Sequence, residues 1–211
     1  MKKIAFSDKY GLTRAVSEGF KTNTRRVEKS LDILPLDYDP ILNDFQSEYC
    51  DGIIIVKRFF KGFHMRTYHF KPRYKIGEVV AVAQSYHELN KSGYLAPEWL
   101  EHTCEDSAGY SNKMFVRADL MPYRIRITDI KVERLQDISD EDCRKEGIME
   151  GEFMNTWDTF YFDQWGDVPN HITFKTPRTA FASLIERISG RGTWERNPWV
   201  FAYEFEHVKD D

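Results

Sequence analysis

Residues 123–135 read YRIRITDIKVERL and indicate the fold more clearly than any other stretch of this chain of 211 residues. Apolar side chains first alternate with polar ones, as on a half-buried strand, at Tyr123, Ile125 and Ile127. The apolar positions then shift phase to Ile130 and Val132. Because a slip of one residue turns side chains to the other face, we expect a β-bulge near Thr128 and Asp129. Such a bulge bends a strand, which favours a strand that curves around a closed sheet.

Four further segments have the composition of strands, and they are residues 52–59, 63–70, 77–86 and 199–206. The first two flank Phe60-Lys61-Gly62, which is typical of a hairpin turn. The last segment places four aromatic side chains on one face, at Trp199, Phe201, Tyr203 and Phe205. Several strands with few helices predict an α+β fold, a small β-barrel flanked by short helices.

Two helices are marked by their end signals. Ser139 can cap a short helix that ends at Gly147. Thr176 and Pro177 provide a cap and a first-turn proline for a second helix, which Gly190 closes. The apolar stripe of this second helix has helical spacing, at Phe181, Leu184, Ile185 and Ile188.

The N-terminal quarter is expected to be mostly irregular. A first helix should begin near Ser7 or Asp8 and end at Gly19. Residues 20–26 then read FKTNTRR, which indicates a polar and cationic turn. The prolines and acidic residues of the segment 30–51 favour a loop.

The charge pattern leaves a nucleic-acid partner open. The net charge is −4, which argues against a nucleic-acid-binding surface over the whole chain. Residues 57–75 nevertheless carry basic side chains without any Asp or Glu, at Lys57, Arg58, Lys61, Arg66, Lys71, Arg73 and Lys75. Aromatic residues interleave with them, and such mixtures suit single-stranded nucleotides because cations neutralise phosphates and rings stack on bases. A hairpin with one solvated basic face and one buried aromatic face would give the same pattern.

Membrane, metal and disulfide classes are disfavoured. No run approaches the roughly 20 apolar residues that a spanning helix requires. The charged pair Asp8-Lys9 comes too early for a secretory segment, so we expect a cytoplasmic protein without membrane contact. The three cysteines, Cys50, Cys104 and Cys143, lack any Cys-x-x-Cys spacing. We therefore expect neither a disulfide framework nor a zinc site, no obligate metal and no cofactor.

Four segments in order resemble the ASCH family, which belongs to the PUA-like superfamily of RNA-associated barrels. They are residues 19–26, residues 74–82, residues 130–139 with 146–148, and residues 181–188 with 197–201. The later segments are most similar to the larger ASCH proteins of bacteria and their phages. The resemblance implies a single domain over residues 1–211, with insertions at about 31–70, 90–121 and 151–175.

The resemblance also implies candidate catalytic residues. Some small ASCH proteins are amidohydrolases that deacetylate N4-acetylcytidine with a lysine, a threonine and a glutamate. Lys21 and Thr24 match the first two within the family's Gly-x-Lys-Thr-x-Thr-x-Arg signature, and Glu146 is the best match for the third. A threonine hydroxyl needs a base to become a nucleophile, and a lysine can be that base if burial or nearby cations lower its pKa. Glu146 could orient the lysine or protonate the leaving amine.

One strand departs from the family pattern. Larger relatives carry Trp-Val-Arg-Glu-Thr-Trp, whereas residues 81–86 read AVAQSY here. The charged pair is missing, so its role cannot be carried over to this chain. Tyr86 keeps an aromatic ring on which a base can stack.

The sequence leaves several functions open. The preferred hypothesis is an RNA- or nucleotide-binding protein whose pocket centres on Lys21–Arg26, with contacts from Arg25, Arg26, Tyr86, Lys57, Arg58 and Arg66. The amidohydrolase with Lys21, Thr24 and Glu146 is the alternative. A phage-derived ribonuclease is disfavoured because His64 and His69 would face opposite sides of a strand. A protein-interaction module would use the aromatic and acidic segment 151–170. In the plainest interpretation Thr24 caps a turn, and Lys21 and Glu146 are surface charges.

Overall fold

The computed structural model describes residues 1–35, 45–60, 64–91, 106–153, 156–162 and 173–208. Its strands are β1 (Lys3–Ile4), β2 (Asn23–Val27), β3 (Phe45–Cys50), β4 (Ile53–Phe60), β5 (His64–Phe70), β6 (Val79–Val82), β7 (Arg124–Arg134), β8 (Met149–Phe153), β9 (Thr156–Tyr161) and β10 (Trp199–His207). Its α-helices are α1 (Leu12–Ser17), α2 (Tyr86–Lys91), α4 (Asp140–Lys145), α5 (Pro177–Ser189) and α6 (Thr193–Arg196). Short 3-10 turns are η1 (Asp8–Tyr10), η2 (Lys29–Ile33), η3 (Ala118–Leu120) and η4 (Leu135–Asp137). The chain is therefore a mixed α+β protein, as predicted.

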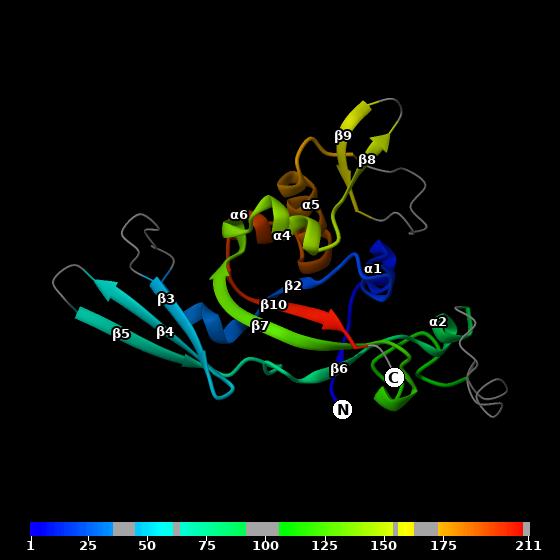
Figure 1. Ribbon diagram of the computed structural model, residues 1–211, viewed down its shortest axis with the longest axis horizontal. Coiled ribbons are helices and arrows are strands. Elements are labelled where there is room, and N and C mark those ends of the chain that lie inside the picture. The colour runs from blue at the N-terminus through cyan, green and yellow to red at the C-terminus, as the bar shows by residue number, and fades with distance from the viewer. Residues whose placement is uncertain (36–44, 61–63, 92–105, 154–155, 163–172, 209–211) are drawn as a thin grey trace.

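The centre of the molecule is a five-stranded sheet in the order β1-β6-β7-β10-β2. The short β1 pairs with β6 in parallel, and the other pairs are antiparallel. The long pair of β7 and β10 forms the middle of this sheet (Figure 1). Among the described residues no pairing joins β1 to β2, so this sheet has two edges and the closed barrel stays a prediction.

The predicted bulge in residues 123–135 is confirmed. Glu204 lies opposite Asp129 and Phe205 lies opposite Ile127, which leaves Thr128 as the extra residue of β7. Because the bulge restores the inward orientation after the slip, Ile125, Ile127, Ile130 and Val132 are all buried. The ribbon of β7 bends into an arc below α4 and α5 (Figure 1).

The second-half helices also follow their end signals. The Thr176 side chain accepts a hydrogen bond from the Thr179 amide, and the Thr179 side chain completes a capping box, with Pro177 in the first turn. Ser139 caps α4 by accepting from the Asp142 amide. On α5 the stripe residues Phe181, Leu184 and Ile185 are buried, whereas Ile188 is 44% exposed.

The N-terminal expectations were wrong in three places. The helix does not begin at Ser7 or Asp8, because Gly11, with φ of +63°, separates the turn η1 from α1. Residues 23–27 are the edge strand β2 rather than part of a turn, since they pair with β10 from Asn23 to Val27. The segment 30–51 is not all loop, because it contains η2 and β3.

Two smaller sheets extend from the centre (Figure 1). The predicted hairpin of residues 52–70 is confirmed as β4 and β5, with β3 as a third antiparallel strand. The alternative of one solvated basic face and one buried aromatic face does not hold for this hairpin, because Arg58 is buried while Phe59 is exposed. The strands β8 and β9 form a hairpin within the segment 149–161, and residues 163–170 of the aromatic segment lie outside the described residues. No helix in the described part of the chain has the length and apolar character to cross a membrane.

The cap of α5 gives a test of the fold. Replacing Thr176 by Ala removes the side-chain acceptor for the Thr179 amide, so we expect the free energy of unfolding to fall by about 1 kcal/mol in urea titrations. Ser183→Ala, in the same helix, removes only a long contact with Arg187 and should change stability by less than about 0.5 kcal/mol. Equal effects of both changes would contradict the capping role.

Candidate functional site

Lys21 is a buried cation between α1 and β2. Its amide donates to the Ala15 carbonyl at 2.9 Å, which turns the chain back towards the core after Gly19. Its side chain is almost fully enclosed, with 1% of the residue exposed. The Nζ atom donates to the Glu146 carbonyl at 2.7 Å and to Glu146 Oε2 at 2.5 Å. A buried ammonium needs such partners, because removing a single ion from water without them costs several kcal/mol.

Glu146 reaches Lys21 because of the turn that ends α4. Glu146 is the last residue of this turn, and Gly147 follows it with φ of +99°. A Cβ atom at Gly147 would lie 3.5 Å from Leu12 and 3.7 Å from the Lys21 side chain. Space remains for a small group there, so it is the left-handed backbone that requires glycine.

Arg25 connects this pair to a larger network. Its side chain is 0% exposed and contacts three carboxylates, at 2.6 Å to Glu133, 2.9 Å to Asp142 and 3.3 Å to Glu146. Lys131 joins the same group, at 3.3 Å from Glu133 and 3.7 Å from Asp142. Because three cations face three carboxylates, the charges of this network balance.

Strand register explains how Arg25 reaches β7. Arg25 lies opposite Ala202 of β10, which in turn lies opposite Lys131 of β7. Residues opposite each other share a face, and the small side chain of Ala202 leaves room between them. The Arg25 guanidinium can therefore extend across β10 to Glu133.

The network borders a cavity of about 390 Å³, which we call the β2 cavity. Its polar lining comes from Lys21, Thr24, Arg25, Arg26 and Glu146. Its apolar lining comes from Phe6, Leu12 and the face of α5 with Phe181, Leu184, Ile185 and Ile188. The structure thus places the sequence-predicted Lys21, Thr24 and Glu146 around one cavity, where none of them is a surface charge or a turn cap. The Thr24 hydroxyl makes no hydrogen bond to Lys21 or Glu146 among the described residues.

Arg26 lines the same cavity from the face of β2 opposite to that of Arg25. Its Nη2 donates to the Ala5 carbonyl at 2.6 Å, and its guanidinium lies 5.4 Å from the centre of the Phe6 ring. Lys21 Nζ lies 5.7 Å from the same ring. Phe6 is therefore flanked by two cations at the wall of the cavity.

Burial changes the proton affinity of these groups. Loss of hydration lowers the pKa of Lys21 from its ordinary value, although the adjacent Glu146 opposes this and the charges of Arg26 and Arg25 assist it. Loss of hydration also lowers the pKa of Arg26. The direction for Lys21 is the one that a lysine base requires.

The other predicted contact residues do not line the β2 cavity. Tyr86 begins α2, which Ser85 caps, and the predicted strand ends earlier, at Val82. Lys57 lies on β4 and faces Glu48 at 3.8 Å. Arg58 is buried on β4, and Arg66 is exposed on β5. Figure 1 places β4 and β5 at one end of the molecule and α2 at the other.

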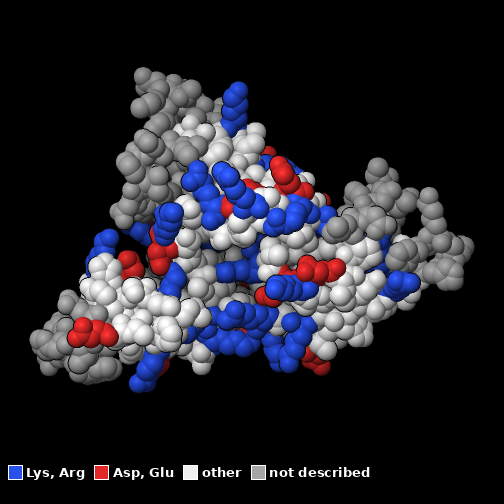
Figure 2. Space-filling view, turned by 180° about the vertical axis from the view of Figure 1, so that it is seen from behind, with Lys and Arg blue, Asp and Glu red and all other residues white. Residues whose placement is uncertain are grey.

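Lysines and arginines also gather outside the cavity. Figure 2 shows their side chains in a band across the middle of one face, with Asp and Glu among them.

His69 is exposed on β5, away from the residues of the β2 cavity. In the described part of the chain no group of three or more His, Cys, Asp or Glu side chains could hold a metal ion.

Sequence reasoning missed the partners of Arg25. Glu133 and Asp142 come from β7 and α4, 108 and 117 positions away in the chain, and Lys131 of β7 contacts the same two carboxylates. Glu133 and Lys131 alternate with the buried Ile130 and Val132, which marks them as one face of a strand. This alternation predicts a polar face on the strand, but it does not predict that Arg25 contacts that face.

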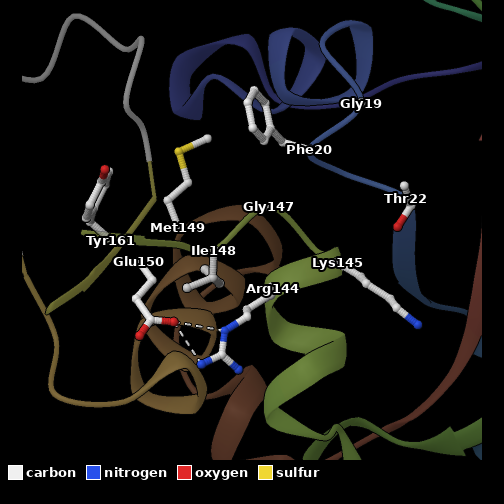
Figure 3. A pocket seen from close by; sticks show the side chains of 10 residues that line it. All are labelled: Gly19, Phe20, Thr22, Arg144, Lys145, Gly147, Ile148, Met149, Glu150 and Tyr161. Atoms are coloured by element: carbon white, nitrogen blue, oxygen red, sulfur yellow. Dashed lines mark hydrogen bonds and ion pairs between the residues drawn. The ribbon is translucent and has the colours of Figure 1, made fainter. Parts of the chain in front are cut away.

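A second cavity of about 520 Å³ lies on the other side of the segment 19–22 (Figure 3). Phe20, which is 56% exposed, and Met149 extend toward one another across it, whereas Lys145 points away. Arg144 and Glu150 form an ion pair at 2.9 Å on its wall. The turn 145–147 therefore borders both cavities, with Glu146 at the first and Gly147 at the second.

Comparison of the chain with protein-family models, with curated proteins and with solved structures gives no match. The relation to the ASCH family therefore stays a proposal that rests on the four sequence segments and on the residues around the β2 cavity.

The buried ion pair can be tested by stability. Glu146→Gln leaves the Lys21 ammonium enclosed without a carboxylate beside it, so we expect the free energy of unfolding to fall by about 3–5 kcal/mol. Glu150→Gln is the matched control, because Glu150 pairs with Arg144 at the surface and its loss should cost less than about 1 kcal/mol. Urea unfolding followed by circular dichroism measures both, and a small loss for Glu146→Gln would show that Lys21 is not held by this charge.

Proposed function

We propose that this chain is an RNA- or nucleotide-binding protein of the ASCH family, and that the β2 cavity holds the nucleotide. The observation that carries the proposal is the composition of this cavity. One side is lined by hydrogen-bonding side chains, and the other by the apolar face of α5. The hydrogen-bonding side chains are those of Lys21, Thr24, Arg25, Arg26 and Glu146. Ligand sites typically combine apolar walls with a few converging polar groups in 300–1,000 Å³, and this cavity fits that pattern.

A nucleobase suits such walls because it has apolar faces and polar edges. The side chains of Leu184, Ile185 and Phe6 offer surfaces against which a flat ring can pack. β2 pairs only with β10 among the described strands, so its outer backbone groups face away from the sheet. Free N–H and C=O groups of an edge strand can bond to base edges.

The proposed barrel has support from the central sheet. The bulge at Thr128 and the arc of β7 give the curvature that closing a small barrel requires (Figure 1). We infer a PUA-like barrel on this ground and on the family segments, with the sheet β3-β4-β5 and the hairpin β8-β9 in the insertions.

Deacetylation is the second candidate function, and one observation favours it. Lys21, Glu146 and Thr24 border the same cavity, and burial lowers the pKa of Lys21. A neutral amine has two N–H groups for the two Glu146 oxygens and a lone pair that can take the Thr24 proton.

In this reaction Thr24 Oγ1 attacks the amide carbonyl carbon while its proton passes to Lys21. The tetrahedral intermediate then breaks its C–N bond, and the nitrogen leaves as the neutral amine with the proton that Lys21 returns. Water, deprotonated by Lys21, then attacks the acyl-threonine carbonyl carbon. The bond between this carbon and Thr24 Oγ1 breaks, Lys21 returns the proton to Oγ1, and the acetyl group leaves as acetic acid, which ionises to acetate. Glu146 acts as a positioning residue, because it fixes the Lys21 amine.

Obstructing the cavity tests nucleotide binding. Ile188 lines the β2 cavity and is partly exposed, so Ile188→Trp should fill the cavity without touching the ion pairs. We expect at least a tenfold loss of affinity for cytidine monophosphate by calorimetry. Ile33→Trp is the matched control, since Ile33 is exposed on η2 and does not line the cavity. Unchanged binding by Ile188→Trp would place the ligand elsewhere.

Turnover tests the second function. The wild type should release cytidine from N4-acetylcytidine, and Thr24→Ala should reduce the release to the uncatalysed background. Because Lys21 acts when neutral, kcat/KM should rise with pH and level off above the lowered pKa of Lys21, well below the ordinary 10.5. Chromatography of the product at several pH values measures this. Binding without cytidine formation would reject the hydrolase and keep the binding function.

A further inference from the structure

Arg26 stands apart from the charge network beside it. Lys21, Arg25 and Lys131 face Glu133, Asp142 and Glu146, so the network is neutral as a whole. Arg26 forms no ion pair with any carboxylate in the described residues. Arg26 is therefore a positive charge at the β2 cavity that has no ion-pair partner in the described part of the chain.

The hydrogen bonds of Arg26 are also incomplete. Its Nη2 bonds to the Ala5 carbonyl, whereas its buried Nε has no acceptor among the described residues. A buried donor without a partner costs about 1–3 kcal/mol. A native structure retains such a group where something else compensates it, and a bound ligand is one such compensation.

The surroundings of Arg26 increase this need. Burial lowers the pKa of Arg26, although the charge of Glu146 acts in the opposite direction. Arg73 is close enough to act in the same direction as burial, and it makes no ion pair in the described structure. The ring of Phe6 covers the guanidinium but carries no full negative charge.

We propose that Arg26 is the anion-binding residue of the β2 cavity, and that the ligand there is a nucleotide bound through its phosphate rather than a neutral nucleoside. This inference rests on the proposed nucleotide binding and specifies its ligand class. Lys21 and Arg25 cannot serve in the same way, because carboxylates already occupy them. A guanidinium suits the task, since its planar donors match phosphate oxygens and it keeps its charge at neutral pH.

The phosphate could belong to a free mononucleotide or to an RNA strand. Both sources offer the same anionic oxygens to Arg26. Titration with cytidine monophosphate and with a cytidine dinucleotide, which has one internal phosphodiester, separates them. Tighter binding of the first indicates a terminal phosphate, and tighter binding of the second indicates a strand.

The decisive experiment compares cytidine with cytidine monophosphate by calorimetry at low salt. We expect the wild type to bind the monophosphate at least tenfold more tightly than cytidine. Arg26→Gln should reduce this ratio to about one. Arg26→Lys should keep part of the preference, because it keeps the charge. Arg117→Gln is the control for a surface arginine, since Arg117 is exposed and pairs with Asp119, and it should leave the ratio unchanged.

The outcomes separate this inference from the proposed function. Equal affinity of the wild type for cytidine and its monophosphate overturns the phosphate role and leaves nucleoside binding intact. Failure of the wild type to bind either compound, or the dinucleotide, removes the proposed function itself. Circular dichroism checks the fold of each variant, and the wild-type ratio remains decisive if Arg26→Gln does not fold.

Discussion

The arrangement of this molecule depends on enclosing charged side chains in mutual contact. Lys21 and Arg25 have almost no contact with solvent, and nearby carboxylates compensate for the hydration that each of them loses. Those carboxylates come from β7, from α4 and from the turn after it. The network therefore requires β2, β7 and α4 to meet in one geometry, and a shift of any of them would leave a charge buried alone. Such a site gives little net stability, but it strongly penalises alternative arrangements.

The β2 cavity follows from the same geometry. With β2 held at the edge of the sheet, Thr24 and Arg26 line the cavity from its polar side, and α5 covers the other side with apolar residues. Arg26 lies beside the balanced network but outside it. The cavity thus combines paired charges with one cation, Arg26, that has no ion-pair partner among the described residues. The sheet β3-β4-β5 and the helix α2 lie at opposite ends of the molecule, away from this cavity (Figure 1).

Local features were predictable from the sequence. The phase shift at Thr128 identified the bulge, because side chains alternate strictly along a strand. Thr176 and Ser139 identified two helix starts, since capping involves residues only three positions apart. The family resemblance pointed to Lys21, Thr24 and Glu146, which the structure places around one cavity. These features could be inferred because they depend on near neighbours or on a known motif.

Long-range features needed the tertiary structure. Residues 23–27 show no strand alternation, and they form β2 only because β10 pairs with them. Four residues of the kinds that bind nucleotides lie outside the β2 cavity, because they belong to α2, β4 and β5. They are Tyr86, Lys57, Arg58 and Arg66. The sequence by itself determined the local turns, caps and alternation. Only the tertiary structure decided which cations have a carboxylate beside them and that Arg26 has no ion pair in the described part of the chain. The carboxylates that pair with Arg25 and Lys21 lie 108 to 125 positions away, and no local pattern specifies them.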